Sequence, residues 1–236
     1  MNQDIEHFKK IVSSNLRSVE QRISEAAGRA GRSRDDVALI AVTKYLDLEH
    51  TQAVADLGCT ILGESRPQVL WEKARQTSES QIDWHLIGHL QRNKAKRTLP
   101  LVSMIHSVDS LRLLQTLHEL AEEPSVECRA LLEVNVSGDQ SKSGFHSTEL
   151  DEVFALLADW PQVKIEGFMC MGGLTSDESA LRKQFSALRT IRDQWKTRTD
   201  WDLAQLSMGM SGDFEIAIEE GATMVRVGSV LYEGTR

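Results

Sequence analysis

Eight short apolar runs, separated by segments with helical periodicity, restrict the fold of this chain more than any other feature. The runs span residues 38–43, 60–62, 84–87, 102–106, 130–136, 163–169, 203–207 and 223–227. Strands that alternate with crossover helices run parallel, and near-continuous apolar character indicates that both faces of the strands are covered. A doubly wound sheet or a closed barrel would satisfy this pattern. The count of eight favours an α/β fold of the (β/α)8 TIM-barrel type.

The length of the chain leaves little room for a second domain. It has 236 residues, and a (β/α)8 barrel typically takes about 250. We therefore expect one domain over residues 1–236. Apolar residues at spacings of three and four predict a long amphipathic helix within residues 1–31. Its apolar face is broad enough to pack on the barrel rather than on a partner subunit, so a monomer is expected.

Charge and composition exclude several classes of partner. The chain has 27 Lys and Arg against 35 Asp and Glu, a net charge of −8, which argues against generic binding to nucleic acid or to an anionic membrane. No run approaches the roughly 20 apolar residues of a membrane span, and no secretory signal is visible, so a cytoplasmic protein is expected. Cys59, Cys128 and Cys170 are far apart in the sequence, as expected of reduced core residues rather than a disulfide framework.

Lys44 directly follows the first apolar run. In a parallel barrel, functional side chains gather at the carboxyl ends of the strands, so Lys44 would lie at the mouth. An amine partly withdrawn from water has a lowered pKa and can form a Schiff base with a carbonyl compound. The alternative is a lysine that extends from the strand end into water.

Two segments rich in glycine and serine predict an anion site. Residues 207–213 join the seventh run to the next helix, and their backbone amides together with the Ser211 hydroxyl would hold a phosphate. Gly228 and Ser229 follow the eighth run, where barrels frequently bind phosphate. Ordinary helix capping by Ser211 or Asp213 is the alternative.

Arg226 lies inside the last apolar run, where a charge needs a partner. Closure of a barrel places the last strand beside the first, so we expect Arg226 and Lys44 to face each other across one seam. A structural ion pair with a neighbouring acid is the alternative.

The remaining polar segments are less informative. His85 and His89 have no thiol or carboxylate partner nearby and are a weak signal for zinc, so no metal site is predicted. The basic residues within 92–97 indicate a solvated helix face, and residues 135–144 would line the mouth or form a plain turn. The usual motifs of nucleotide hydrolases, dinucleotide-binding proteins, serine hydrolases and zinc proteases are missing. Among the ligand classes considered, an aldehyde or ketone that carries a phosphate remains.

Motifs along nearly the whole chain resemble those of the pyridoxal 5′-phosphate homeostasis proteins, the YggS/PROSC family. They include Ala-Val-Thr-Lys and Gly-Glu-Ser early in the chain and Leu-Ser-Met-Gly-Met-Ser and Met-Val-Arg-Val-Gly near its end. In order, they occupy residues 41–44, 63–65, 84–94, 135–137, 142–144, 206–211 and 224–228.

This resemblance implies a barrel like the alanine racemase N-terminal domain, with pyridoxal phosphate held as a Schiff base on Lys44. It also implies that Arg226 approaches the pyridine nitrogen and keeps it unprotonated, which limits carbanion chemistry. Phosphate contacts are implied for Ser211, Gly228 and Ser229. The full set of expected cofactor-binding residues is Lys44, Ser65, His85, Met210, Ser211, Arg226, Gly228 and Ser229.

Two positions depart from the family pattern. Ser65 stands where an asparagine usually follows Gly-Glu, and His89 stands where a proline usually follows Ile-Gly. A hydroxyl is shorter than an amide and cannot donate two hydrogen bonds, so Ser65 cannot make the side-chain contact of an asparagine in full.

The function implied by the resemblance is pyridoxal phosphate binding and cofactor homeostasis, with transient contact to apoenzymes that need the cofactor. Neither robust turnover nor a catalytic residue is expected, because the chain has no counterpart of the second domain of alanine racemases. One alternative is a small pyridoxal phosphate-dependent amino-acid racemase or lyase, with Tyr45 or His85 as the acid or base. Another is a sugar-phosphate isomerase or binding barrel without the cofactor.

Overall fold

The computed structural model of the chain describes residues 3–77, 82–122, 127–138, 143–173 and 177–235. Within them, eight parallel strands form a closed barrel in which each strand pairs with its neighbours in sequence and β8 pairs with β1. The strands are β1 (Ala38–Val42), β2 (Ile61–Glu64), β3 (Asp83–Leu86), β4 (Met104–Val108), β5 (Cys128–Glu133), β6 (Val163–Met169), β7 (Gln205–Met210) and β8 (Met224–Val227). The predicted (β/α)8 barrel is therefore confirmed.

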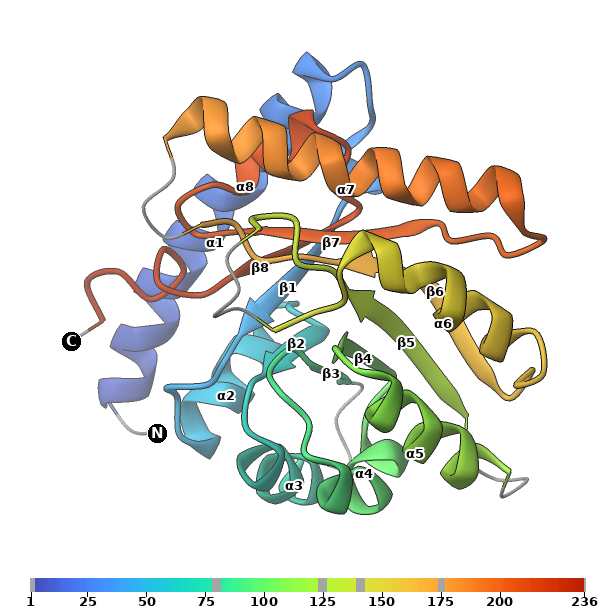
Figure 1. The fold of residues 1–236 in the computed structure, drawn as a ribbon. Coiled ribbons are helices and arrows are strands. Elements are labelled where there is room, and N and C mark those ends of the chain that lie inside the picture. Colours follow the sequence, from blue (N-terminus) through green and yellow to red (C-terminus); the bar gives the residue numbers. More distant parts are fainter. Residues whose placement is uncertain (1–2, 78–81, 123–126, 139–142, 174–176, 236) are drawn as a thin grey trace.

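The helices lie outside the ring of strands (Figure 1). They are α1 (Gln3–Arg29), α2 (Leu48–Asp56), α3 (Pro67–Gln76), α4 (Arg92–Thr98), α5 (Leu111–Ala121), α6 (Leu150–Leu157), α7 (Glu178–Arg198) and α8 (Phe214–Glu219). Short 3-10 turns occupy Arg34–Asp36, Leu99–Leu101 and Ser147–Glu149. None of the described helices is both long and apolar enough to cross a membrane.

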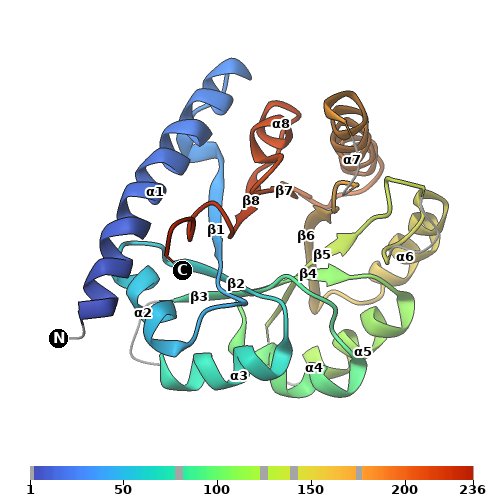
Figure 2. The same ribbon diagram turned by 90° about the vertical axis from the view of Figure 1, so that its left-hand side faces the viewer.

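The long N-terminal helix α1 is present as predicted. Its apolar side, which includes Phe8, Val12, Val19 and Ile23, is buried, and the helix packs against α2 and α8 beside the β1–β8 seam (Figure 2). Gly31, at φ +68°, follows its end in a conformation that favours glycine. The C-terminal segment runs back to α1, as Figures 1 and 2 both show.

Several strands extend beyond the apolar runs that predicted them. Strand β2 continues to Glu64 and β7 to Met210, so residues 207–210 belong to a strand rather than to a loop. In β2 the added residues are Gly63 and the charged Glu64, and in β7 a glycine, Gly209, lies between two methionines, so the apolar pattern is interrupted before each strand ends.

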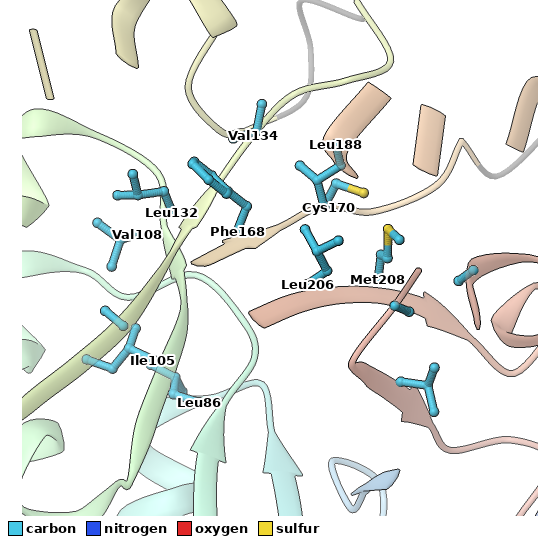
Figure 3. Packing of buried hydrophobic residues seen from close by; sticks show 14 of the residues in the cluster. Leu86, Ile105, Val108, Leu132, Val134, Phe168, Cys170, Leu188, Leu206 and Met208 are labelled. Carbon is cyan, nitrogen blue, oxygen red and sulfur yellow. The ribbon is translucent and has the colours of Figure 1, made fainter. Parts of the chain in front are cut away.

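The core has an outer and an inner part. The outer part fills the space between strands and helices and includes Leu132, Phe168 and Leu206 (Figure 3). The inner part is a small apolar cluster within the barrel, formed by Ile40, Met104, Leu131, Met169 and Met224. Because these side chains fill the barrel, a ligand has room only at its mouth.

The three cysteines lie in described parts of the chain, where each is buried and none is in a disulfide, as predicted. Burial raises the pKa of Cys59 to about 11 and that of Cys128 to about 12. Both side chains are therefore neutral thiols at neutral pH and behave as small apolar residues.

Candidate functional site

A cavity of about 1140 Å³ opens at the mouth of the barrel. Seven of the eight predicted binding residues line it, namely Lys44, Ser65, Met210, Ser211, Arg226, Gly228 and Ser229. The loops that follow β1, β2, β7 and β8 carry most of them, because the carboxyl ends of all eight parallel strands meet at this face. His85 is not part of the lining.

Lys44 enters the cavity just beyond the end of β1. The residue is half-buried, and its Nζ lies 5.1 Å from the centroid of the Tyr45 ring. Its carbonyl accepts a hydrogen bond from Nη2 of Arg66 (3.2 Å). The lysine is therefore held at its backbone while its amine stays within reach of a ligand in the cavity.

The loops after β7 and β8 meet at Ser211. The backbone amides of Gly228 and Val230 both donate to the Ser211 hydroxyl oxygen, at 3.1 and 3.5 Å. A Cβ on residue 228 would lie 3.3 Å from the Cβ of Val42, so glycine lets the last loop pass close to β1. A phosphate oxygen is typically bound in the same way, by two backbone amides that converge on it.

The side chain of Asp213 does not cap the following helix, which was the alternative for this segment. Asp213 precedes α8, but its carboxylate accepts from the Met210 amide (2.6 Å) and makes no capping bond to the helix. Burial raises the pKa of this carboxyl.

Arg226 is buried in the barrel interior, and the alternative of a structural ion pair does not hold among the described residues. Its Nη1 donates to the Ser207 hydroxyl (2.6 Å) and its Nη2 to the Cys170 carbonyl (2.9 Å), and none of the described ion pairs includes it. In the register of β1 and β8 it stands opposite Ile40, four residues before Lys44. The predicted pairing of the first and last strands is correct, but Arg226 and Lys44 lie at different heights along these strands rather than face to face.

A chain of hydrogen bonds leads from Arg226 to His85. His106 Nδ1 lies 2.8 Å from the Ser207 hydroxyl, and His106 Nε2 lies 2.9 Å from His85 Nδ1. Burial lowers the pKa of His85 to about 4 and that of His106 well below its usual value, so both rings are neutral at neutral pH.

The direction of this chain follows from the chemistry of its first member. A guanidinium only donates, so the Ser207 hydroxyl accepts from Arg226. The other described partner of this buried hydroxyl is His106 Nδ1, so its O–H donates a hydrogen bond to that nitrogen. His106 then carries its proton on Nε2 and donates it to His85 Nδ1. In the described residues His85 is thus linked to the site through His106, Ser207 and Arg226, and its predicted direct contact with the cofactor stays a prediction.

Replacing Ser207 with alanine is expected to destabilise the protein. The change leaves the buried Nη1 of Arg226 and Nδ1 of His106 without their shared partner, which costs about 1–3 kcal/mol of unfolding free energy. Urea denaturation measures this loss, with the exposed Ser179→Ala as the control. Equal unfolding midpoints for Ser207→Ala and Ser179→Ala would show that the hydroxyl does not link the two groups.

Glu133 is a cavity residue that the sequence reasoning missed. It ends β5, which lies across the closed barrel from β1, and it is 4% exposed. The Ser143 hydroxyl donates to its Oε1 (2.8 Å), and burial raises its pKa. The available signal was the same as for Arg226, a charge inside an apolar run.

The remaining candidate positions lie at or near the rim. Ser65 donates its amide to Oε1 of Glu64 (2.8 Å), and His89 pairs with Asp109 through Nδ1 (2.8 Å). Asn135 forms a local turn with residue 137, and Lys142 lies outside the described residues. No three metal-binding side chains gather in the part of the chain that the structure describes.

Comparison with known proteins identifies the family. Residues 14–236 match the model described as "Alanine racemase, N-terminal domain". A curated relative from Aquifex aeolicus, named pyridoxal phosphate homeostasis protein, is 36% identical over 217 residues, which cover 92% of this chain and 95% of the relative. The chain belongs to the pyridoxal phosphate homeostasis protein family.

Solved structures agree with this assignment and with the fold. PipY from Synechococcus elongatus PCC7942, solved with pyridoxal phosphate bound, is 29% identical and superposes with a TM-score of 0.83 over 94% of this chain and 99% of PipY. Alanine racemase from Corynebacterium glutamicum is 16% identical with a TM-score of 0.71, over 95% of this chain and 61% of the racemase. The second likeness concerns the fold alone and confirms the predicted alanine racemase-like barrel of the family.

Proposed function

We propose that this protein binds pyridoxal phosphate and serves its homeostasis, storing and releasing the cofactor, with Lys44 as the covalent attachment point through a Schiff base. The observation that carries the proposal is that a reachable amine, the backbone amide of Gly228 beside Ser211 and a buried guanidinium line one cavity. Membership of a family whose relatives are named for pyridoxal phosphate homeostasis supports it.

The residues present fit the chemical groups of this cofactor. The amides of Gly228 and Val230, with the Ser211 hydroxyl, would take the phosphate, and Ser229 and Met210 would close the same side. The amine of Lys44 would meet the aldehyde. Arg226, held by neutral groups, would present its charge to the pyridine ring. When bound, the cofactor supplies an aldehyde that amines attach to and leave reversibly.

The finer parts of the proposal concern partners and place of action. We infer a monomer that acts in the cytoplasm and hands the cofactor to apoenzymes by transient contact, without robust turnover of its own. The exposure of Tyr45, 77% at the cavity rim, supports the lack of robust turnover, because a side chain packed on few neighbours is not held against a reacting group.

The test is reductive trapping on the wild-type protein. Dialysed protein is mixed with pyridoxal phosphate, its visible spectrum is recorded, and borohydride reduction is followed by peptide mass mapping. A Schiff-base band and a reduced adduct on the Lys44 peptide are expected. No band and no adduct would leave a phosphate-binding barrel without the cofactor. Exchange of the α-proton of alanine above the rate with free cofactor would instead favour a racemase or lyase, with Glu133 as the buried candidate base.

A further inference from the structure

An ion pair lies beneath the cavity wall, almost completely withdrawn from water. Lys73 of α3 and Glu64 of β2 are joined at 2.9 Å between Nζ and Oε2, and their side chains are 5% and 0% exposed. Neither residue lines the cavity. Burying two charges costs solvation that their attraction repays only in part, so such a pair is weak evidence for a stabilising role.

The ammonium of Lys73 has a second partner next to Lys44. It donates to the carbonyl oxygen of Thr43 at 2.8 Å. Thr43 is fully buried, and the same carbonyl accepts from the Leu46 amide (2.9 Å). The ion pair thus holds the peptide group that leads directly into Lys44.

The carboxylate of Glu64 holds the other side of the wall. Its Oε1 accepts from the amide of Ser65 at 2.8 Å and from that of Arg66 at 3.5 Å. Arg66 in turn donates to the carbonyl of Lys44 at 3.2 Å. The pair therefore ties both neighbouring strand ends to one another around Lys44.

We propose that Lys73 and Glu64 are positioning residues that fix the backbone on both sides of Lys44 and so set where its amine meets an aldehyde. They act through Thr43, Ser65 and Arg66 and touch no ligand themselves. This inference rests on the proposed function, because it assigns the attachment of the cofactor to Lys44.

The first measurement is the rate of attachment. The double variant Lys73→Met with Glu64→Gln removes both charges together, so no unpaired charge stays buried. The adduct on the Lys44 peptide, trapped with borohydride and counted per folded molecule, is expected to form at least tenfold more slowly than in wild type. The matched control, Arg129→Met with Glu166→Gln, breaks a half-buried pair between β5 and β6 and leaves the rate unchanged.

The second measurement needs no cofactor. Hydrogen exchange of the Leu46 amide in the cofactor-free protein reports on the Thr43 carbonyl, and we expect it to quicken at least tenfold in the double variant and not in the control. An exchange rate equal to wild type overturns the inference, and so does an equal attachment rate in folded double variant. If wild type forms no adduct, the proposed function fails, and the exchange experiment still decides whether the pair holds the backbone.

A milder variant covers the case in which the double variant does not fold. Lys73→Arg keeps the charge, but a planar guanidinium does not place its donors where one ammonium does. Attachment at Lys44 is expected to slow at least threefold, with faster exchange at Leu46. Unchanged values for both measurements would contradict the positioning role.

Discussion

Replacing Lys44 with alanine is expected to abolish the visible band and the borohydride-reducible adduct with pyridoxal phosphate. The reason is that a Schiff base needs a primary amine, and Lys44 brings its amine to the cavity. The same cavity contains Ser211 and Gly228, the residues proposed to bind the phosphate. We expect binding of the cofactor to weaken at least tenfold, because only noncovalent contacts remain. Spectral titration and reductive trapping measure both effects.

Two further variants separate the charge of Lys44 from its chemistry. Lys44→Arg keeps a cation in place but cannot form the bond, so it is expected to lack the band as well. Lys164→Ala removes an exposed lysine paired with Glu127 and serves as the control that keeps the band. Binding of the same strength, with the wild-type spectrum, in Lys44→Ala would refute the attachment at this residue.

Stability is expected to fall as the pH is lowered from about 6.5 to about 4, owing to the buried pair His85 and His106. An unfolded histidine takes up a proton near pH 6.5, whereas burial lowers the pKa of folded His85 to about 4 and lowers that of His106 as well. In this window the unfolded chain binds more protons, so acid favours unfolding. The stability from these neutral rings is complete above pH 6.5 and is lost as the pH falls through the folded pKa.

The size of the effect follows from the same shift. A difference of 6.5 − 4 = 2.5 in the pKa of His85 corresponds to about 3 kcal/mol of unfolding free energy, and His106 acts in the same direction. Burial raises the pKa of Glu133 and Asp213. Their contribution to the unfolding free energy therefore increases as the pH falls, opposite to that of the histidines, because the folded state holds their protons more tightly.

Urea denaturation at a series of pH values isolates the histidine contribution. The slope of unfolding free energy against pH is compared between wild type and His85→Gln, which removes one titrating ring but keeps polar groups. We expect the slope between pH 6.5 and 4 to drop by up to about 1.4 kcal/mol per pH unit in the variant. Identical slopes would mean that His85 titrates in the folded protein as it does in water.

The barrel and part of its site could be predicted because both depend on local order along the chain. Apolar runs spaced by helices predict parallel strands, and residues just after those runs, such as Lys44, Ser211 and Gly228, necessarily come to the mouth. Closure of the barrel also predicts that β8 pairs with β1. These rules need no side-chain geometry.

The residues that could not be predicted work through partners that only the folded barrel supplies. Lys73 lies on a helix, and periodicity alone does not indicate that its ammonium reaches inward to Thr43 and Glu64. His106 and Ser207 lie within apolar runs, where a single polar residue has no visible partner. His85 was expected at the cofactor, and the structure places it next to His106 and outside the cavity lining, which the sequence did not indicate.

The docking of α1 against the end of the chain links a helix outside the barrel to the cavity. The side-chain amide of Asn15 donates to the carbonyls of Leu231 and Glu233, and Phe8 of α1 stacks on Tyr232 within the cavity lining. A ligand that contacts the part of the cavity formed by Phe8 and Tyr232 binds only when α1 is docked, so it shifts the local unfolding equilibrium of α1 toward the docked state. By thermodynamic reciprocity, a change that favours undocking of α1 weakens the equilibrium affinity for such a ligand by the same factor by which the ligand favours docking.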